Sequence, residues 1–257
     1  MAPRPHHPPM AKPKNVELSN GVLIPIIYED ACTLAIDKPA GWMCAPTNWQ
    51  STGRNLQAAL ESSVNHRDYW AKSRNLNFLR FVHRLDADTS GVLLLAKSAG
   101  ALKALSELFQ TRAVEKSYLA VVAGVVAEDE WSCDLRIGPV KGRRGVMKVD
   151  PAVEGEAYTE FRTLQRRNGF SLIEAKPLTG RTHQIRVHLQ AGGHPVLNDP
   201  LYGNDDAEKQ MLALRATEVS YVEPFRKKRV HIRARVAKFI GAHGFEVKQA
   251  EKIRRSD

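Results

Sequence analysis

The sequence predicts an α+β fold, and three observations support this expectation. Residues 92–96 form an unbroken apolar run of strand length, which is typical of a strand buried on both faces. Several other runs of strand length lie between turn residues. A few segments repeat apolar residues at helical spacing, and strand runs mixed with few helices indicate the α+β class.

The elements follow in chain order from a short N-terminal segment. Residues 1–14 hold five prolines and no apolar periodicity, so we expect disorder there. A strand, a turn and a second strand should follow. A helix is then expected over 55–63, because Leu56, Ala59 and Leu60 recur at helical spacing.

The middle of the chain continues with a capped helix and further strands. Ser98 follows the apolar run and suits the cap of a helix. The apolar stripe of that helix, which we assign to the core, consists of Leu102, Leu105, Leu108 and Phe109. Strands are expected over 116–122, 156–166 and 171–176. A helix is expected over 182–189, ended by Gly192 and Gly193.

Residues 138–155 have the composition of a loop, rich in glycine and basic residues. Lys141, Arg143 and Arg144 within it could grip backbone phosphates, or the segment could be a mobile hairpin tip. The sequence is compatible with both.

Composition limits the class of protein. The 257 residues can form one substantial core, and one domain is the simplest account. The three cysteines lack a C-x-x-C spacing and follow no signal peptide, which indicates free thiols in a reducing cytoplasm. No apolar run approaches the roughly 18 residues that span a bilayer, so we expect no membrane insertion. His6 and His7 stand without further ligands, so we expect no metal site.

The charge is concentrated near the C-terminus. The chain carries a net charge of +10, and residues 225–257 alone hold eleven basic and three acidic residues. The densest run is Arg226, Lys227, Lys228 and Arg229. Such a run favours a polyanionic partner, because binding releases counterions. A solvated basic tail is the alternative.

A dense polar cluster precedes the apolar run. Residues 83–91 are His-Arg-Leu-Asp-Ala-Asp-Thr-Ser-Gly, which supply carboxylates, a guanidinium, an imidazole and two hydroxyls at the start of a rigid strand. Taken alone, this composition also fits an ordinary polar turn. We place the active site at this junction.

The same nine residues resemble the HRLD-x-x-TSG signature of the RluA-type RNA pseudouridine synthases at every fixed position. Residues 26–30 and 34–41 resemble the family's first motif, with Asp37 in place of the usual asparagine. Lys116-Ser117-Tyr118 resembles the Lys-x-Tyr motif, and residues 178–189 resemble the TGRTHQIRVH segment. Four segments in the family's order, covering roughly residues 24–220, identify the chain as a member of this family.

The resemblance implies a single catalytic domain over 16–224, with a central mixed, largely antiparallel sheet flanked by helices and loops. A flexible segment at 1–15 would precede it, and a basic segment at 225–257 would follow and could pack on it. The implied reaction isomerises uridine to pseudouridine in ribosomal or transfer RNA: the C1′–N1 bond breaks, the uracil turns, and C5 joins C1′. Nothing is added or lost, so no cofactor is expected. RNA is the expected partner, and a monomer is the expected state.

The family's catalytic aspartate corresponds to Asp86, acting as a nucleophile or as a base at the sugar, two routes that stay open here. Asp88 would point to the opposite side of an extended segment and is interpreted as a turn former. A carboxylate that stays ionised while partly desolvated needs a fixed positive partner. The resemblance assigns this partner to Arg181, whose guanidinium suits a bidentate contact, with Arg186 as the fallback.

The resemblance assigns further roles around the base. Tyr118 corresponds to the active-site tyrosine that lies against the uracil face. Arg84 would fill the space left by the flipped nucleotide, and His83 beside it is interpreted as a structural histidine. Leu197 resembles the family's apolar contact to the flipped nucleotide, although Asn198 replaces the usual glycine.

Two alternatives come from other functional classes. The chain could bind RNA or assist ribosome assembly with the same fold and no turnover. The intact set of Asp86, Tyr118 and Arg181 argues against this, because a pure binder has no need of a desolvated carboxylate facing a polyanion. A basic nucleic-acid-binding domain of other ancestry would require four ordered resemblances to be coincidental.

Overall fold

The structure is a computed structural model that describes residues 11–44, 54–203, 211–248 and 250. The strands are β1 (Asn15–Glu17), β2 (Leu23–Glu29), β3 (Thr33–Lys38), β4 (Arg80–Phe81), β5 (Ser90–Ala96), β6 (Val114–Ala123), β7 (Glu130–Cys133), β8 (Ile137–Pro139), β9 (Met147–Val149), β10 (Thr159–Arg167), β11 (Phe170–Pro177), β12 (Leu214–Val222) and β13 (Arg229–Arg233). The helices are α1 (Leu56–Asn65), α2 (Tyr69–Lys72), α3 (Ala99–Gln110), α4 (Gln184–Ala191) and α5 (Ala237–Ala242).

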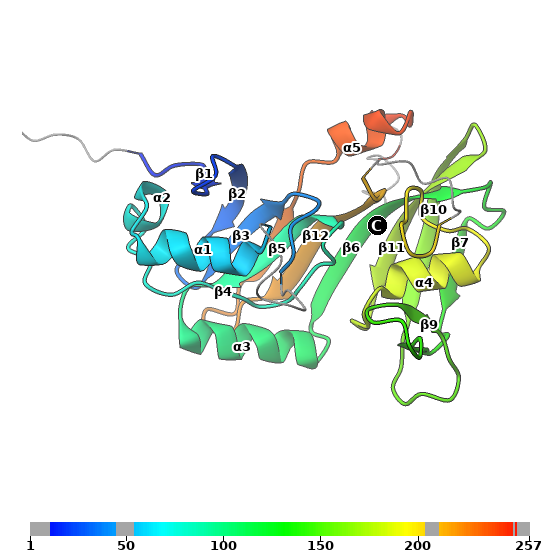
Figure 1. Cartoon of the computed structure of the whole chain (residues 1–257), viewed down its shortest axis with the longest axis horizontal. Coiled ribbons are helices and arrows are strands. Elements are labelled where there is room, and N and C mark those ends of the chain that lie inside the picture. The colour runs from blue at the N-terminus through cyan, green and yellow to red at the C-terminus, as the bar shows by residue number, and fades with distance from the viewer. Residues whose placement is uncertain (1–10, 45–53, 204–210, 249, 251–257) are drawn as a thin grey trace, which may run out of the picture.

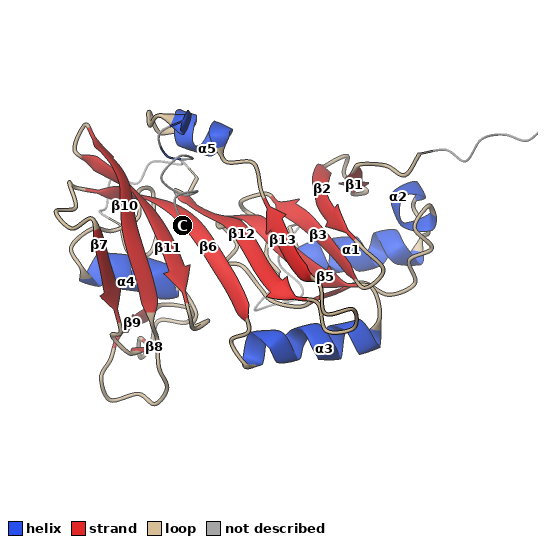
Figure 2. Cartoon of the chain, turned by 180° about the vertical axis from the view of Figure 1, so that it is seen from behind, coloured by secondary structure: helices blue, strands red, loops and turns tan. Residues whose placement is uncertain are grey.

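One long twisted sheet organises the described residues (Figure 1). Its strand order is β1-β2-β3-β5-β12-β6-β11-β10-β7, with β13 beside β12 and β4 beside β5. Neighbouring strands run antiparallel except β5 and β12, which are parallel. Seen from behind, the strands face the viewer while α1 and α4 lie on the far side (Figure 2). The predicted α+β class and the mixed, largely antiparallel sheet are confirmed.

The N-terminal half explains why residues 92–96 are apolar at every position. Val92 and Leu94 point into a core that contains Leu105 of α3, whereas Leu93 and Leu95 point into a second core that contains Leu56 of α1. Strand β5 is therefore buried between two helices on opposite faces, as predicted. Burial of each such side chain contributes roughly 1.5–3 kcal/mol to folding.

The two predicted helix starts in this half are confirmed. The Asn55 side chain accepts a hydrogen bond from the Ala58 N–H at 3.1 Å, and the Ser98 Oγ accepts one from the Ala101 N–H at 3.1 Å. Each oxygen satisfies a backbone donor that the first helical turn leaves unpaired.

The C-terminal half packs β6, β11, β10 and β7 against α4. The predicted strands over 116–122, 156–166 and 171–176 correspond to β6, β10 and β11. Helix α4 begins two residues later than predicted, because His183 takes a left-handed conformation with φ +57° and helical geometry starts at Gln184. It ends before Gly192, and Gly193 has φ +81°, which suits glycine.

Two segments whose structure the sequence left open have a definite place in the fold. Residues 138–155 include the β8–β9 hairpin, whose tip carries the basic residues. In the basic C-terminal segment, β13 pairs with β12, and Ile240 of α5 is fully buried in the core around β6. Its described part therefore packs on the sheet and is not a solvated tail. Most of the N-terminal stretch expected to be disordered, residues 1–10, and the last seven residues lie outside the described residues.

Every helix in the described ranges is too short or too polar to cross a bilayer. Cys32, Cys44 and Cys133 are free thiols.

Candidate active site

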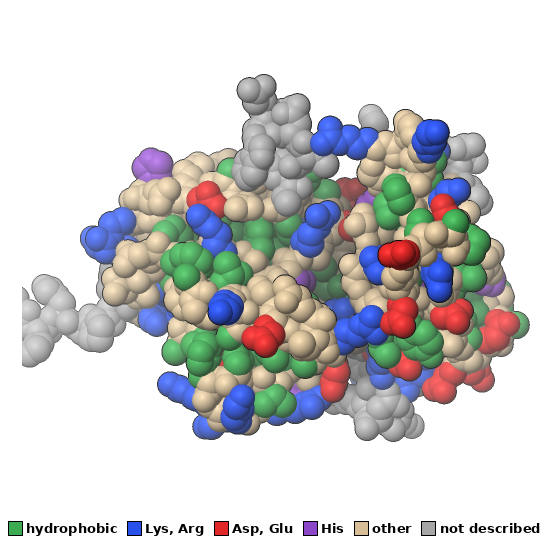
Figure 3. Space-filling model, turned by 90° about the horizontal axis from the view of Figure 1, so that it is seen from below, with side chains coloured by type: hydrophobic (Ala, Val, Ile, Leu, Met, Phe, Trp, Pro, Cys, Tyr) green, Lys and Arg blue, Asp and Glu red, His purple; other side chains and the backbone are tan. Residues whose placement is uncertain are grey.

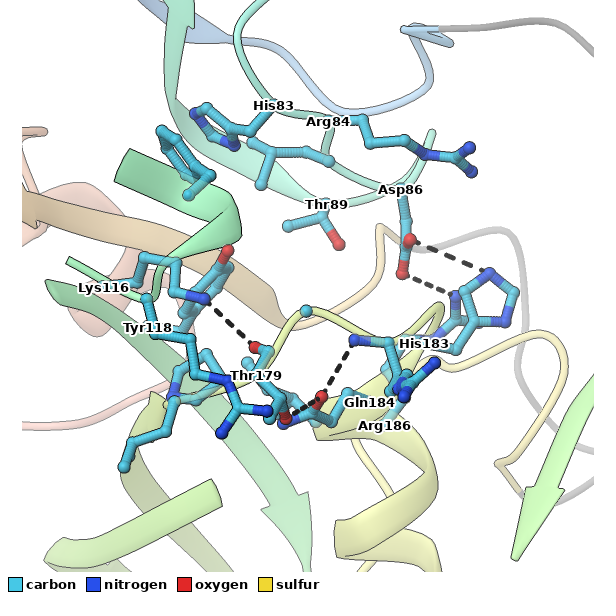
Figure 4. A pocket seen from close by; sticks show the side chains of 18 of the residues that line it. His83, Arg84, Asp86, Thr89, Lys116, Tyr118, Thr179, His183, Gln184 and Arg186 are labelled. Atoms are coloured by element: carbon cyan, nitrogen blue, oxygen red, sulfur yellow. Dashed lines mark hydrogen bonds and ion pairs between the residues drawn. The ribbon is translucent and has the colours of Figure 1, made fainter. Parts of the chain in front are cut away.

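A cleft of about 490 Å³ opens where the two halves of the sheet meet (Figure 4). Its walls come from the segment 82–89 before β5, the end of α3, strand β6, and the segment 177–186 that leads into α4. The polar cluster and two of the other resembling segments, far apart in the chain, therefore line one cavity.

Asp86 lies in this cleft on a loop that the side chain of Lys38 holds in place. The fully buried Lys38 ammonium donates to the carbonyl oxygens of Pro39, Ala87 and Thr89 at 3.0, 2.8 and 2.9 Å. Burial lowers the pKa of Lys38 to about 8. Asp86 lines the cleft and Asp88 is not among its lining residues, in agreement with their expected opposite directions.

Arg186 of α4 is the positive partner of Asp86. Its Nη1 lies 3.2 Å from Asp86 Oδ2, and its Nε and Nη2 each donate to Asp199 at 2.7 Å. Burial opposes the charge of Arg186, but the carboxylates of Asp199 and Asp86 outweigh it and raise its pKa. Asp199 therefore fixes the guanidinium, and the guanidinium presents its remaining edge to Asp86.

The predicted pairing of Asp86 with Arg181 is corrected by this geometry. Because α4 begins at Gln184, Arg181 stays in the preceding turn, and its Nε donates to the Glu156 carbonyl at 3.0 Å. Its guanidinium lies against Gly155, where a Cβ atom would approach Nη2 to 1.7 Å. Arg181 still lines the cleft, but the fallback residue Arg186 makes the ion pair.

Gln184 holds the turn that shapes this wall. Its Oε1 accepts from the Thr179 hydroxyl and the Arg181 N–H at 2.7 and 2.9 Å. Its Nε2 donates to Tyr158 O and Thr159 Oγ1, both at 2.9 Å. All four bonding positions of the buried amide are used, so the turn is rigid.

Tyr118 and Lys116 point from β6 into the cleft. Burial, aided by the charge of Asp86, raises the pKa of Tyr118, so its hydroxyl stays protonated. The Lys116 ammonium donates to the Thr179 carbonyl at 3.1 Å, and burial lowers its pKa to about 8. Lys116 belongs to the Lys-x-Tyr motif, but its place in the cleft was not predicted.

The two polar residues before Asp86, Arg84 and His83, differ in exposure: the first is exposed and the second is partly buried. Arg84 is exposed at the rim of the cleft. His83 Nε2 accepts from the Leu94 N–H at 3.1 Å, and the ring stacks on Phe109 at 4.7 Å. Burial lowers the pKa of His83 to about 3, so the ring is neutral and structural, as interpreted from the sequence.

The Thr89 hydroxyl is buried beside Asp86 and lines the cleft. Among the described residues it has no hydrogen-bond partner. A buried hydroxyl without a partner carries a desolvation cost, which a ligand in the cleft can relieve.

Other predicted contact residues lie outside the cleft. Leu197 packs against the core of the C-terminal half, and its N–H donates to the Val121 carbonyl at 2.8 Å. Asn198 has φ +58°, a conformation that asparagine tolerates better than most residues, which accounts for it in place of glycine. The remaining basic candidates are exposed, either at the β8–β9 tip or at the β12–β13 turn: Lys141, Arg143, Arg144, Arg226, Lys227, Lys228 and Arg229.

His183, Asp199 and Tyr202 were missed as site residues. His183 Nε2 lies 3.8 Å from Asp86 Oδ1, and its Nδ1 lies 2.8 Å from the Tyr202 hydroxyl. The sequence signal for His183 was its place in the segment 178–189, whereas Asp199 and Tyr202 lie in a loop with no pattern of its own. In the parts of the chain that the structure describes, no cluster of three or more His, Cys, Asp or Glu side chains could hold a metal ion.

The fold and the site together define a class. A fixed carboxylate, a buried guanidinium and a protonated phenol meet in an open cleft between two halves of a mixed sheet, an arrangement suited to acid–base or nucleophilic chemistry on a bound polar substrate. A family model described as RNA pseudouridylate synthase matches residues 33–191, more than half of the chain. The chain belongs to the RNA pseudouridylate synthase family.

Individual relatives agree with this membership. An uncharacterized RNA pseudouridine synthase of Mycoplasma pneumoniae is 35% identical over 217 residues, which are 83% of this chain and 67% of the relative. Ribosomal large subunit pseudouridine synthase D of Borreliella burgdorferi is 34% identical over 76% of this chain and 59% of its own length. The corresponding synthase C of Haemophilus influenzae is 35% identical over 72% and 55%. The matches thus span between about half and two thirds of these relatives.

The fold has a counterpart among solved structures. Human RNA pseudouridylate synthase domain containing 1 has a TM-score of 0.70 and 24% sequence identity, and the match covers 91% of this chain and 95% of the human one.

Proposed function

We propose that the protein is an RNA pseudouridine synthase that isomerises specific uridines in ribosomal or transfer RNA, with Asp86 as its catalytic carboxylate. The observation that carries the proposal is the ion pair of Asp86 with the buried Arg186 inside the cleft. A guanidinium is charged at any physiological pH, so Arg186 presents a permanent positive charge to this carboxylate when RNA covers the site.

The reaction needs no group beyond the chain and the RNA. The Asp86 carboxylate acts at the sugar, as a nucleophile or as a base, while the C1′–N1 bond breaks. The uracil then turns, C5 bonds to C1′ and loses its proton, and N1 takes up a proton, so atoms and electrons balance without a co-reactant. Tyr118 is held protonated, which suits it to contact the uracil face and donate a hydrogen bond rather than to act as a base.

Access to a stacked uridine requires extrusion of the base, at a cost of a few kcal/mol. Arg84 is exposed at the cleft rim, where a planar guanidinium can stack on the neighbouring bases and fill the space. Arg181 lies on the opposite wall, where it can contact a phosphate of the extruded nucleotide. Leu197 packs against the core and does not line the cleft, so we do not retain it as a nucleotide contact.

The RNA backbone is expected to contact the exposed basic groups at the β8–β9 tip and the β12–β13 turn. Figure 3 shows Lys and Arg side chains spread across the face seen from below, with Asp and Glu side chains gathered mainly at one side. We further propose a cytoplasmic monomer with one catalytic domain that starts near residue 16 and extends past the expected end at 224, because β13 and Ile240 of α5 pack on the sheet. The free cysteines and the matched length of the human structure support these proposals.

The decisive test maps pseudouridine in total RNA from cells with and without this gene. We expect one or more sites to disappear and to be restored by the purified wild-type protein. Asp86→Ala should bind RNA and form no product, whereas Asp88→Ala, a carboxylate two residues away and outside the cleft lining, should restore the sites. If no site disappears and the purified protein makes none, the RNA-binding or ribosome-assembly alternative replaces the synthase.

A further inference from the structure

His183 lies between the hydroxyl of Tyr202, which can donate a hydrogen bond, and the carboxylate of Asp86, which can only accept one. Its Nδ1 is 2.8 Å from the hydroxyl of Tyr202, and its Nε2 faces Asp86 Oδ1 at 3.8 Å. The Tyr202 hydroxyl oxygen already accepts a hydrogen bond from the Met147 N–H at 2.9 Å. The three contacts form a chain from strand β9 to the proposed catalytic carboxylate.

Only one neutral tautomer of His183 suits both neighbours. If Nδ1 carried the proton, the lone pair of Nε2 would face the carboxylate, and two acceptors would repel each other. If Nε2 carries the proton, the Tyr202 O–H donates to Nδ1 and the Nε2–H points at Asp86. Each group then finds a partner of the correct kind.

We propose that His183 is a positioning residue for Asp86, held in its Nε2–H tautomer by the hydroxyl of Tyr202; this deepens, and rests on, the proposed function. At 3.8 Å the N–H and the carboxylate interact electrostatically, and such contacts tighten when substrate binds. Arg186 and His183 then hold the two carboxylate oxygens from different directions.

The backbone at His183 supports a dedicated role. Its φ of +57° lies in the left-handed region, where histidine, asparagine and aspartate are more common than other side chains. Strained positions of this kind persist where the surrounding contacts determine them. Tyr202 supplies such contacts, because its ring also packs edge-on against His183 and lies under the Arg186 guanidinium at 5.0 Å.

The charge state of the ring agrees with the proposal. Burial lowers the pKa of His183, against the attraction of Asp86 and Asp199, while Arg186 and Arg84 oppose a positive charge on it. The imidazole is therefore neutral near pH 7, so a tautomer is the relevant state.

The tautomer can be measured without activity. In protein labelled with ¹⁵N-histidine, long-range ¹H–¹⁵N spectra distinguish the Nε2–H from the Nδ1–H form, and His183→Asn identifies the signal of this residue. We expect the Nε2–H pattern in the wild type and a mixture of tautomers in Tyr202→Phe. Tyr28→Phe is the control, because it removes a tyrosine hydroxyl that donates to Asp30 and lies far from His183 in the sequence. It should leave the tautomer pattern of His183 unchanged.

Kinetics test the positioning role. Asparagine keeps the left-handed backbone and a polar group facing Tyr202 but lacks the Nε2–H, whereas glutamine can place an amide N–H near that atom. We expect His183→Asn to lower the single-turnover rate on RNA roughly 10²-fold at unchanged RNA affinity. His183→Gln should recover part of that loss, and Tyr202→Phe should fall between the wild type and His183→Asn.

The outcomes separate this inference from the proposed function. An Nε2–H signal that depends on Tyr202 supports the arrangement even if no RNA product forms, in which case the proposed function alone fails. An Nδ1–H signal in the wild type overturns it, as does an active His183→Asn with the wild-type single-turnover rate. Thermal unfolding of each variant identifies any that fail to fold, and Tyr202→Phe then carries the test.

Discussion

Gly91 and Ala216 touch backbone to backbone at the point where the two halves of the sheet join. They are paired in the short parallel contact between β5 and β12, and a Cβ atom on Gly91 would lie 1.9 Å from the Ala216 carbonyl oxygen. The last residue of the segment 83–91 thus allows β5 to lie this close to β12.

Replacement of Gly91 by alanine should therefore destabilise the protein strongly. The clash involves backbone, which cannot rotate away, and Gly91 also has φ +112°, which alanine disfavours. We expect a loss of about 2–5 kcal/mol in the free energy of unfolding in denaturant. Gly100→Ala on α3, where a Cβ would meet nothing within 4 Å, is the matched control and should be neutral or stabilising.

Substitution of Arg186 should lower the stability of the protein, whereas substitution of Arg181 should weaken RNA binding and leave stability unchanged. Arg186→Gln leaves the buried Asp199 carboxylate without its bidentate partner, so we expect a loss of roughly 3–5 kcal/mol in unfolding free energy. Arg181→Gln removes an exposed side chain bonded to one carbonyl and should leave stability unchanged while weakening RNA binding. Equal stability of the two variants in the same denaturation experiment would contradict the assignment of the ion pair.

The sequence predicted most of the elements with a strong local pattern, and it failed where tertiary contacts decide. Strand β12 was not predicted, although residues 214–222 begin and end with apolar residues and contain several β-branched ones. Polar residues interrupt that pattern. Arg215, for example, is buried because its guanidinium bonds Asp37 at 2.7 Å and Ser90 at 3.2 Å. At this position the Asp37 carboxylate thus has a charged partner in Arg215.

In the site too, features with a local sequence pattern were predicted, whereas those that depend on tertiary contacts were not. The positions of Asp86 and Tyr118 in the cleft were predicted from the resemblance, because each belongs to a segment whose local structure is simple. For the partner of Asp86 the resemblance gave Arg181, with Arg186 as the fallback. The structure selects Arg186, because the Gln184 side chain and the left-handed His183 shape the turn that keeps Arg181 outside α4. Arg181 stays in the turn before α4, whereas Arg186 lies within the helix and faces Asp86.

Thr89 should act through its unpaired hydroxyl when nucleotide occupies the cleft. Thr89→Val keeps the shape of the side chain and removes the buried hydroxyl, so stability should be equal or higher. If bound nucleotide satisfies this group, the variant should lose roughly 5- to 15-fold in kcat/KM, the equivalent of one hydrogen bond of about 1–1.5 kcal/mol. Thr89→Ser should retain activity. A valine variant with full kcat/KM would show that the hydroxyl does not meet the substrate.

Stability should fall on acidification because of His83. The pKa of this ring is about 3 in the folded protein against an ordinary value of 6.5, so below pH 6.5 the unfolded chain takes up a proton that the folded protein does not. The contribution is intact above pH 6.5 and is lost as the pH falls toward 3, by up to about 1.4 kcal/mol per pH unit. His83→Gln, which keeps an acceptor for the Leu94 N–H, should show a shallower decline between pH 6 and 4. Parallel curves for the two proteins would assign the acid sensitivity to other groups.

The β12–β13 turn should contribute to RNA affinity through charge alone. Lys227 and Lys228 are exposed there, while the adjacent Arg229 is engaged with Glu115 at 2.6 Å. Reversing both lysines to glutamate should weaken RNA binding and reduce the slope of log affinity against log salt by about one for each phosphate that is no longer neutralised. Lys72→Glu, on α2 at the far end of the molecule, provides a control for the change in net charge. If both variants weaken binding equally, the effect belongs to the overall charge and the turn makes no phosphate contact.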